Sequence, residues 1–311
     1  MFFAGLSMGV GMYDTVFAYT SPGRAHPQPC FLMPLDNETT GFLQASDGTA
    51  LFYREWRHHQ PGGAIVLVHG LGEHGGRYAE LAGLFHDAGL SVRIHDHRGH
   101  GQSGGVRGSL RSDADFLTDL KLVFDDFAQQ CDATPFLFGH SLGGLVAARF
   151  ATGGLSKVRG LLLSSPALAI RMTGFQKVLL ALTTRIAPGL AVPTSLPAQL
   201  VSHDVEVVQA YRRDALNHGK VAARVVNFML AAQVQVQRDA ATFTLPLLLQ
   251  IAGDDAFVDP QGSRSFFAAV PQVDKKLYCY DDAYHEIFNE SKERRLRAQG
   301  DLRSWLASHL T

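Results

Sequence analysis

The residue best placed for chemistry is Ser141, the centre of the pentapeptide G-H-S-L-G at residues 139–143. This sequence fits the pattern G-x-S-x-G, in which a serine occupies a sharp turn between a strand and a helix. An apolar run precedes it at 135–138, and a helical pattern rich in small residues follows at 142–151. Flanking glycines allow close packing of the turn, and a helix N-terminus favours negative charge. We therefore predict that Ser141 is a nucleophile.

A nucleophilic serine needs a base within hydrogen-bond reach and an acid that orients the base. An acidic loop follows the apolar run at 245–251, with candidate acids at Asp254, Asp255 and Asp259. The next apolar run, at 276–280, is followed by His285, the only histidine between residues 219 and 308. The order serine, acid, histidine, each after a later strand, is one in which such triads occur. We predict that His285 is the general base and that one of the three aspartates is its partner.

Two backbone N–H groups could stabilise the oxyanion of a tetrahedral intermediate. One is that of Leu142, directly after the nucleophile. The other is expected in the loop H-G-L-G at 69–72, where Leu71 is the candidate because its small neighbours let a substrate approach the main chain. Losing one such donor typically costs ~2.7–4 kcal/mol of transition-state stabilisation.

A cluster of histidines offers a competing interpretation as a metal site. Its members lie in two loops, at His69 and His74, and at His95, His97 and His100 together with Asp96. Metal-dependent hydrolases use such residues. However, His95 and His97 would point to opposite faces of a continuing strand, and no second cluster at ligand spacing follows. We expect these residues to shape the loop, and we expect no metal.

Strand and helix patterns alternate over residues 64–165 and again over 245–310, which predicts an α/β fold with a mainly parallel central sheet flanked by helices. The run A-I-V-L-V at 64–68 is typical of a strand buried on both faces. The stretch 166–243 breaks the rhythm, with no convincing strand and with helical patterns at 178–186, 205–211 and 221–232. We interpret this stretch as a helical insertion on top of the sheet.

Composition and charge exclude several classes of protein. Of 311 residues, 46% are hydrophobic, which is too many for a disordered chain. The 28 basic and 29 acidic residues give a net charge of −1, which argues against a nucleic-acid partner. Three widely spaced cysteines form no disulfide framework, so we expect a reducing, cytoplasmic environment. No G-x-G-x-x-G follows a strand and no phosphate-cradling loop is present, so we expect no cofactor.

The N-terminal stretch differs from the rest of the chain. No run approaches the ~20 apolar residues that span a bilayer. A secretory signal would begin with basic residues, but no basic residue precedes Arg24. We predict that residues 1–40 are an unstructured extension. We further expect that residues 1–32 are upstream coding sequence and that Met33 is the natural start.

Three sequence blocks carry a resemblance to a known family. They are H-G-L-G-E-H-G-G-R-Y at 69–78, D-H-R-G-H-G-Q-S at 96–103 and G-H-S-L-G-G at 139–144. With them, residues 41–310 resemble the monoacylglycerol lipases and lysophospholipase-like serine hydrolases of the α/β-hydrolase superfamily. The resemblance implies that Ser141 is the nucleophile, that His285 is the base and that Leu71 and Leu142 are the oxyanion residues. By its spacing to Pro260, the resemblance places the acid at Asp255 rather than Asp254.

The resemblance also implies a division of the chain. Residues 41–165 and 244–311 would form the hydrolase core, and residues 166–243 a helical cap over the site. Three apolar cap residues could line a tunnel for an acyl chain, namely Val178, Phe228 and Met229. An exposed apolar face of the cap would suit transient contact with membranes or micelles.

The resulting functional hypothesis is a hydrolase that cleaves carboxylic esters of small lipids, monoacylglycerols or lysophospholipids, through an acyl-enzyme. Other activities of the same fold stay open as alternatives: a general carboxylesterase, a peptidase, a C–C hydrolase or an acyltransferase. A non-catalytic ligand receptor is a further alternative. A receptor usually lacks part of the triad, whereas this chain has candidates for all three members.

Overall fold

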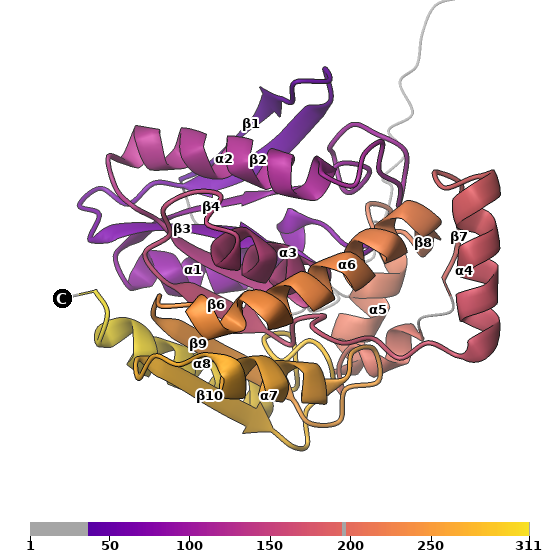
Figure 1. The fold of residues 1–311 in the computed structure, drawn as a ribbon. Coiled ribbons are helices and arrows are strands. Elements are labelled where there is room, and N and C mark those ends of the chain that lie inside the picture. The colour runs from indigo at the N-terminus through magenta and orange to yellow at the C-terminus, as the bar shows by residue number, and fades with distance from the viewer. Residues whose placement is uncertain (1–36, 195–196, 311) are drawn as a thin grey trace, which may run out of the picture. The chain divides into compact units, whose positions relative to one another are not determined.

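A computed structural model describes residues 37–194 and 197–310. Its centre is an eight-stranded sheet in the order β1-β2-β4-β3-β5-β6-β9-β10 (Figure 1). The strands are β1 Glu38–Gln44, β2 Ala50–Trp56, β3 Gly63–Val68, β4 Leu90–His95, β5 Phe136–His140, β6 Leu161–Ser164, β9 Leu247–Ala252 and β10 Lys275–Tyr280. β2 pairs antiparallel with both β1 and β4, and the other neighbouring strands are parallel. The predicted α/β class with a mainly parallel sheet is confirmed.

Helices cover both faces of this sheet. α2, α3 and α7 pack on one face, and α1 and α8 on the other. Their bounds are α1 Ala79–Asp87, α2 Asp115–Cys131, α3 Ser141–Thr152, α7 Pro260–Ala269 and α8 Lys292–Ala307. In β3, Val66 belongs to the first core and Leu67 to the second, and both are fully buried. The uninterrupted apolar run of β3 therefore reflects a strand with a core on each side.

Between β6 and β9 the chain forms three further helices and a small second sheet. They are α4 Gly174–Ile186, α5 Val205–Arg213 and α6 Ala223–Asp239, with β7 Ala191–Pro193 pairing antiparallel with β8 Lys220–Ala222. Single 3-10 turns lie at Gly75–Tyr78, Ala198–Leu200 and Ala240–Thr242. The expectation that this stretch holds no strand is wrong. Both strands have three residues and pair across 26 intervening residues (194–219), so neither produces an alternating pattern long enough to recognise.

The last helix of this insertion belongs to the main core. Val225, Phe228 and Val236 of α6 are buried in the same cluster as α3. By contrast, α4 contains no buried residue. In Figure 1, α4 lies at the far end of the insertion from the central sheet. Within the insertion, α6 is therefore integral to the core, whereas α4 is not.

The N-terminal boundary differs from the prediction. β1 begins at Glu38, inside the predicted extension that was expected to end at residue 40. It is an edge strand without a fully buried residue, so its sequence lacks the apolar alternation that would mark it. Residues 1–36, with Met33, lie outside the described residues. No helix in the described part of the chain has the length and apolarity needed to cross a membrane.

Candidate active site

Ser141 lies at the turn between β5 and α3, and its backbone is strained. Its φ of +54° is in the left-handed region, which non-glycine residues rarely adopt. A Cβ on Gly139 would lie 2.4 Å from the carbonyl oxygen of Gly143, and one on Gly143 would lie 2.2 Å from that of Val68. The turn therefore tolerates no side chain at either glycine. The strand, turn and helix predicted around Ser141 are all present.

His285 and Asp255 are brought together by the loops after β10 and β9. Nδ1 of His285 donates to Oδ2 of Asp255 over 2.7 Å. The other oxygen, Oδ1, accepts from the backbone N–H groups of Phe257 (2.8 Å) and Val258 (3.0 Å). Asp255 is therefore held by three hydrogen bonds, with its side chain only 1% exposed.

Each partner shifts the pKa of the other. Burial alone would raise the pKa of Asp255, but the charge and hydrogen bond of His285 outweigh it, so the pKa lies below its usual value. Burial alone would lower the pKa of His285, but Asp255 outweighs it and the pKa is raised. The imidazole is thus a stronger base than a free histidine.

The three crowded aspartates of this loop point in different directions. Asp254 is exposed to solvent. Asp259 caps α7 by accepting from the N–H of Gln261 (3.1 Å), and it pairs with Arg171 (3.2 Å). Among the three, Asp255 is the one that contacts His285.

Ser141 and His285 line one cavity of about 550 Å³. The ring of His285 lies 4.8 Å, centroid to centroid, from that of His140, the residue before Ser141. Leu71 and Leu142 line the same cavity. A Cβ on Gly70 would lie 3.2 Å from that of Ser141, so the loop after β3 passes directly beside the serine. Outside helices and strands, the backbone hydrogen bonds of residues 37–194 and 197–310 include none donated by the N–H group of Leu71 or of Leu142.

The histidine cluster holds loops together. His69 donates from Nδ1 to the carbonyl of Gly70 (2.7 Å) and accepts at Nε2 from the N–H of His97 (2.9 Å). Nε2 of His97 donates in return to the carbonyl of His69 (3.0 Å). Burial, reinforced by His100, lowers the pKa of His69 well below its usual value, so the ring is neutral. Among the described residues, no group of three His, Cys, Asp or Glu side chains is arranged to hold a metal ion.

Two of the three predicted tunnel residues lie elsewhere. Met229 lines the cavity. Phe228 does not, because it points into the core and packs edge-on against Phe116 at 5.2 Å. Val178 is 64% exposed on the outer side of α4, and its neighbours Leu179 and Leu180 line the cavity instead.

Three charged residues beside the site were given no role from the sequence. Glu73, Arg77 and Glu286 form a buried cluster between the loops that carry Leu71 and His285. Glu73 and Arg77 fall within the block at 69–78 that carries the family resemblance. Their presence there was the available signal, but their contacts could not be read from it.

The fold and the strained serine turn define an α/β-hydrolase, and the comparisons with known proteins agree. Residues 59–292 match the family model described as "Serine aminopeptidase, S33". A monoacylglycerol lipase of Mycolicibacterium smegmatis is 35% identical over 269 residues, covering 85% of this chain and 95% of the relative. Phospholipase YtpA of Bacillus subtilis is 31% identical over 239 residues, covering 76% of this chain and 92% of the relative.

Solved structures give the same result. The monoacylglycerol lipase of Paleococcus ferrophilus is 34% identical, with a TM-score of 0.76, covering 83% of this chain and 99% of that one. A monoglyceride lipase of Saccharomyces cerevisiae shares the fold, with a TM-score of 0.84 and 20% identity, covering 92% of this chain and 100% of that one. The chain therefore belongs to the serine aminopeptidase S33 family of α/β-hydrolases. The resemblance to monoacylglycerol lipases and the expected carboxylic ester hydrolase are confirmed.

Proposed function

We propose that this protein hydrolyses the carboxylic esters of small lipids, monoacylglycerols or lysophospholipids, through an acyl-enzyme on Ser141. The observation that carries the proposal is the buried hydrogen bond between Asp255 and His285, because His285 lines the same cavity as Ser141. A lipid substrate is supported by the relatives named as monoacylglycerol lipase and phospholipase.

The proposed mechanism assigns one task to each residue. Because Nδ1 of His285 is bonded to Asp255, Nε2 is the nitrogen left to accept the proton of Ser141 as its oxygen attacks the ester carbonyl. The N–H groups of Leu71 and Leu142 would donate to the resulting oxyanion. His285 then gives the proton to the departing alcohol, and water attacks the acyl-serine by the same route.

The cavity wall supports an acyl chain as the recognised group. Much of the wall is aliphatic, including Ile170, Leu179, Leu180, Val226 and Met229. Each buried CH₂ contributes ~0.8 kcal/mol, or about fourfold in kcat/KM where the chain is buried in the transition state. Lengthening the acyl chain should therefore raise kcat/KM stepwise until the cavity is filled.

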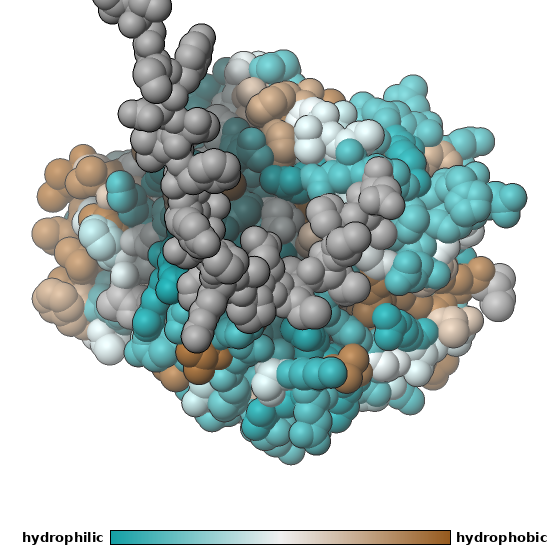
Figure 2. Space-filling view, turned by 180° about the vertical axis from the view of Figure 1, so that it is seen from behind, coloured by the Kyte–Doolittle hydropathy of each residue, from teal (hydrophilic) through white to brown (hydrophobic). Residues whose placement is uncertain are grey.

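The exposed side of α4 supports contact with a lipid surface. Its apolar residues Phe175, Val178, Leu182 and Ile186 follow at helical spacing and are 57–78% exposed. Figure 2 shows apolar side chains gathered at the edge of the molecule where Figure 1 places α4. We propose that this face touches membranes or micelles transiently and delivers substrate to the cavity behind it.

A peptidase activity is the main alternative, since the family description names one. An aminopeptidase needs a free carboxylate for the ammonium group of its substrate. The cavity is lined by two carboxylates, Glu73 and Glu286, and Arg77 is bonded to both. This pairing favours a neutral lipidic ester over a charged peptide N-terminus.

The test is a substrate panel with the purified protein. It comprises monoacylglycerols of increasing acyl length, lysophosphatidylcholine, a p-nitrophenyl ester and an aminoacyl p-nitroanilide, with Ser141→Ala as control. We expect ester hydrolysis that rises with acyl length and is lost in Ser141→Ala. Preferential cleavage of the anilide would favour the peptidase, and turnover of no substrate would favour a receptor.

A further inference from the structure

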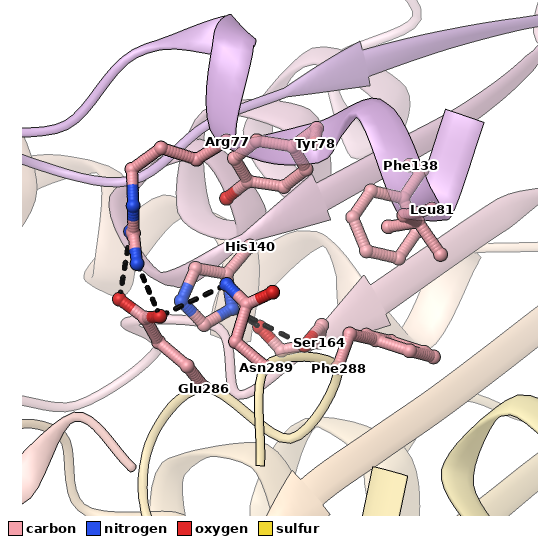
Figure 3. A pocket seen from close by; sticks show the side chains of 9 residues that line it. All are labelled: Arg77, Tyr78, Leu81, Phe138, His140, Ser164, Glu286, Phe288 and Asn289. Carbon is pink, nitrogen blue, oxygen red and sulfur yellow. Dashed lines mark hydrogen bonds and ion pairs between the residues drawn. The ribbon is translucent and has the colours of Figure 1, made fainter. Parts of the chain in front are cut away.

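Arg77 lies between the two loops on which the proposed chemistry depends. Its Nη1 donates to Oε2 of Glu73 (2.5 Å) and to Oε1 of Glu286 (2.8 Å), and its Nη2 donates to Oε2 of Glu286 (2.7 Å). Figure 3 shows the guanidinium facing the Glu286 carboxylate. The Arg77 side chain is only 10% exposed, and the ring of Tyr211 from α5 lies over it at 4.8 Å.

Glu73 connects this guanidinium to the loop after β3. Its Oε1 accepts from the backbone N–H of Gly70 (2.6 Å) and from the hydroxyl of Tyr78 (2.7 Å). Gly70 immediately precedes Leu71, whose N–H is a proposed oxyanion donor. The position of the Glu73 carboxylate therefore fixes the peptide next to that donor.

Glu286 connects the same guanidinium to the loop after β10. It directly follows His285. Both of its oxygens accept from Arg77, and Oε2 also accepts from Nδ2 of Asn289 in the same loop (2.9 Å). Glu286 is buried. The hydrogen bonds to its carboxylate therefore restrain the loop that carries His285.

Two buried carboxylates this close would repel each other without a shared cation. Replacing a buried ion pair with well-packed apolar side chains is often neutral or even stabilising. Stability alone therefore does not account for this cluster. We propose that Arg77 is a positioning residue that, through Glu73 and Glu286, locks the loop of Leu71 to the loop of His285. It thereby keeps the oxyanion donor and the base in fixed relation to Ser141. This inference rests on the proposed function, since it concerns the same site.

The cluster also sets the charge around the base. The ionisable groups that face His285 are Asp255, Glu286, Glu73, His140 and, behind the two glutamates, Arg77. The carboxylates favour the protonated imidazole, and Arg77 opposes them. Burial and His285 lower the pKa of His140 to about 4, so His140 is neutral. Removing Arg77 and removing Glu286 should therefore shift the titration of His285 in opposite directions.

Three variants separate geometry from charge. Arg77→Lys keeps the charge but loses the planar fork that binds both carboxylates. We expect kcat to fall about 10- to 100-fold, as for a misplaced catalytic group. KM should not change, and neither should the acid limb, the part of the pH profile in which kcat/KM falls at low pH. Arg77→Met should move the acid limb to higher pH, and Glu286→Gln should move it to lower pH. End-point labelling of Ser141 with a fluorophosphonate counts active sites, so kcat refers to folded protein.

Arg93→Lys is the matched control, because Arg93 is a fully buried arginine paired with Glu55 and Asp126 away from the cavity. It should lose stability while keeping kcat per labelled site and the acid limb. If the Arg77 and Glu286 variants behave like this control, the positioning role is refuted while the proposed function stands. If wild-type protein is not labelled and hydrolyses no ester, the proposed function fails and the positioning role with it.

Discussion

Replacing Asp255 with asparagine should inactivate the protein while leaving its structure intact. Oδ1 of Asp255 accepts from the N–H groups of Phe257 and Val258, so the oxygen of the new amide will stay there. Turning the amide round would leave two buried N–H groups without an acceptor, at about 1–3 kcal/mol each. The NH₂ group of the asparagine must then face Nδ1 of His285.

The consequence is a change of tautomer in His285. Facing an NH₂ group, Nδ1 has to accept a hydrogen bond, so the ring proton moves to Nε2. Protonated Nε2 cannot accept the proton of Ser141. The same substitution in a serine protease triad lowers kcat about 10⁴-fold, which corresponds to about 5.4 kcal/mol of activation free energy. We expect a loss of this order.

The assay is kcat for a soluble p-nitrophenyl ester, normalised to folded protein by circular dichroism. Asp254→Asn is the matched control, because it makes the same charge change at the exposed neighbouring residue. It should retain most of the activity. The reasoning is wrong if Asp255→Asn stays within about tenfold of wild type, or if Asp254→Asn is the inactive variant.

Three further predictions concern the turn at Ser141, the exposed side of α4 and pH. Gly143→Ala should lower the free energy of unfolding, measured with urea, by about 3 kcal/mol or more, because its Cβ would meet the Val68 carbonyl. Its control, Gly83→Ala, has open space around it in α1 and should raise the free energy of unfolding by about 0.5–1 kcal/mol. Equal effects of the two substitutions would contradict the steric argument. Leu182→Ser combined with Ile186→Ser should lower hydrolysis of vesicle-borne monoacylglycerol about tenfold, or about 1.4 kcal/mol, and spare a soluble ester. Val273→Ser, at a 97% exposed residue outside the insertion, is the control that should change neither. Because the base must be neutral and the pKa of His285 is raised, kcat/KM should reach half its maximum above the usual imidazole value of about 6.5; a midpoint below that value would contradict the assignment of His285.

Elements with a strong physical signature could be predicted from the sequence. The run at 64–68 predicted β3 because burial on both faces favours an uninterrupted apolar run. Gly139 and Gly143 predicted the turn at Ser141 because no larger residue fits there. α7 was missed although Asp259 and Pro260 carry the cap and first-turn signature of a helix start.

Side-chain direction was the part that the sequence could not supply. Phe228 and Met229 are adjacent in α6, yet one faces the core and the other the cavity, because consecutive helical residues point about 100° apart. The choice between Asp254 and Asp255 has the same origin, since the loop turns them in different directions. From the residues alone that choice was open, and the family resemblance favoured the residue that contacts His285.

The most direct test of the proposed acyl-enzyme is mass spectrometry of protein caught during turnover of a slowly deacylated ester. We predict an added acyl mass that peptide mapping places on Ser141, and that is absent from Ser141→Ala and strongly reduced in His285→Ala. Acylation of another residue, or full ester turnover by Ser141→Ala, would contradict the mechanism.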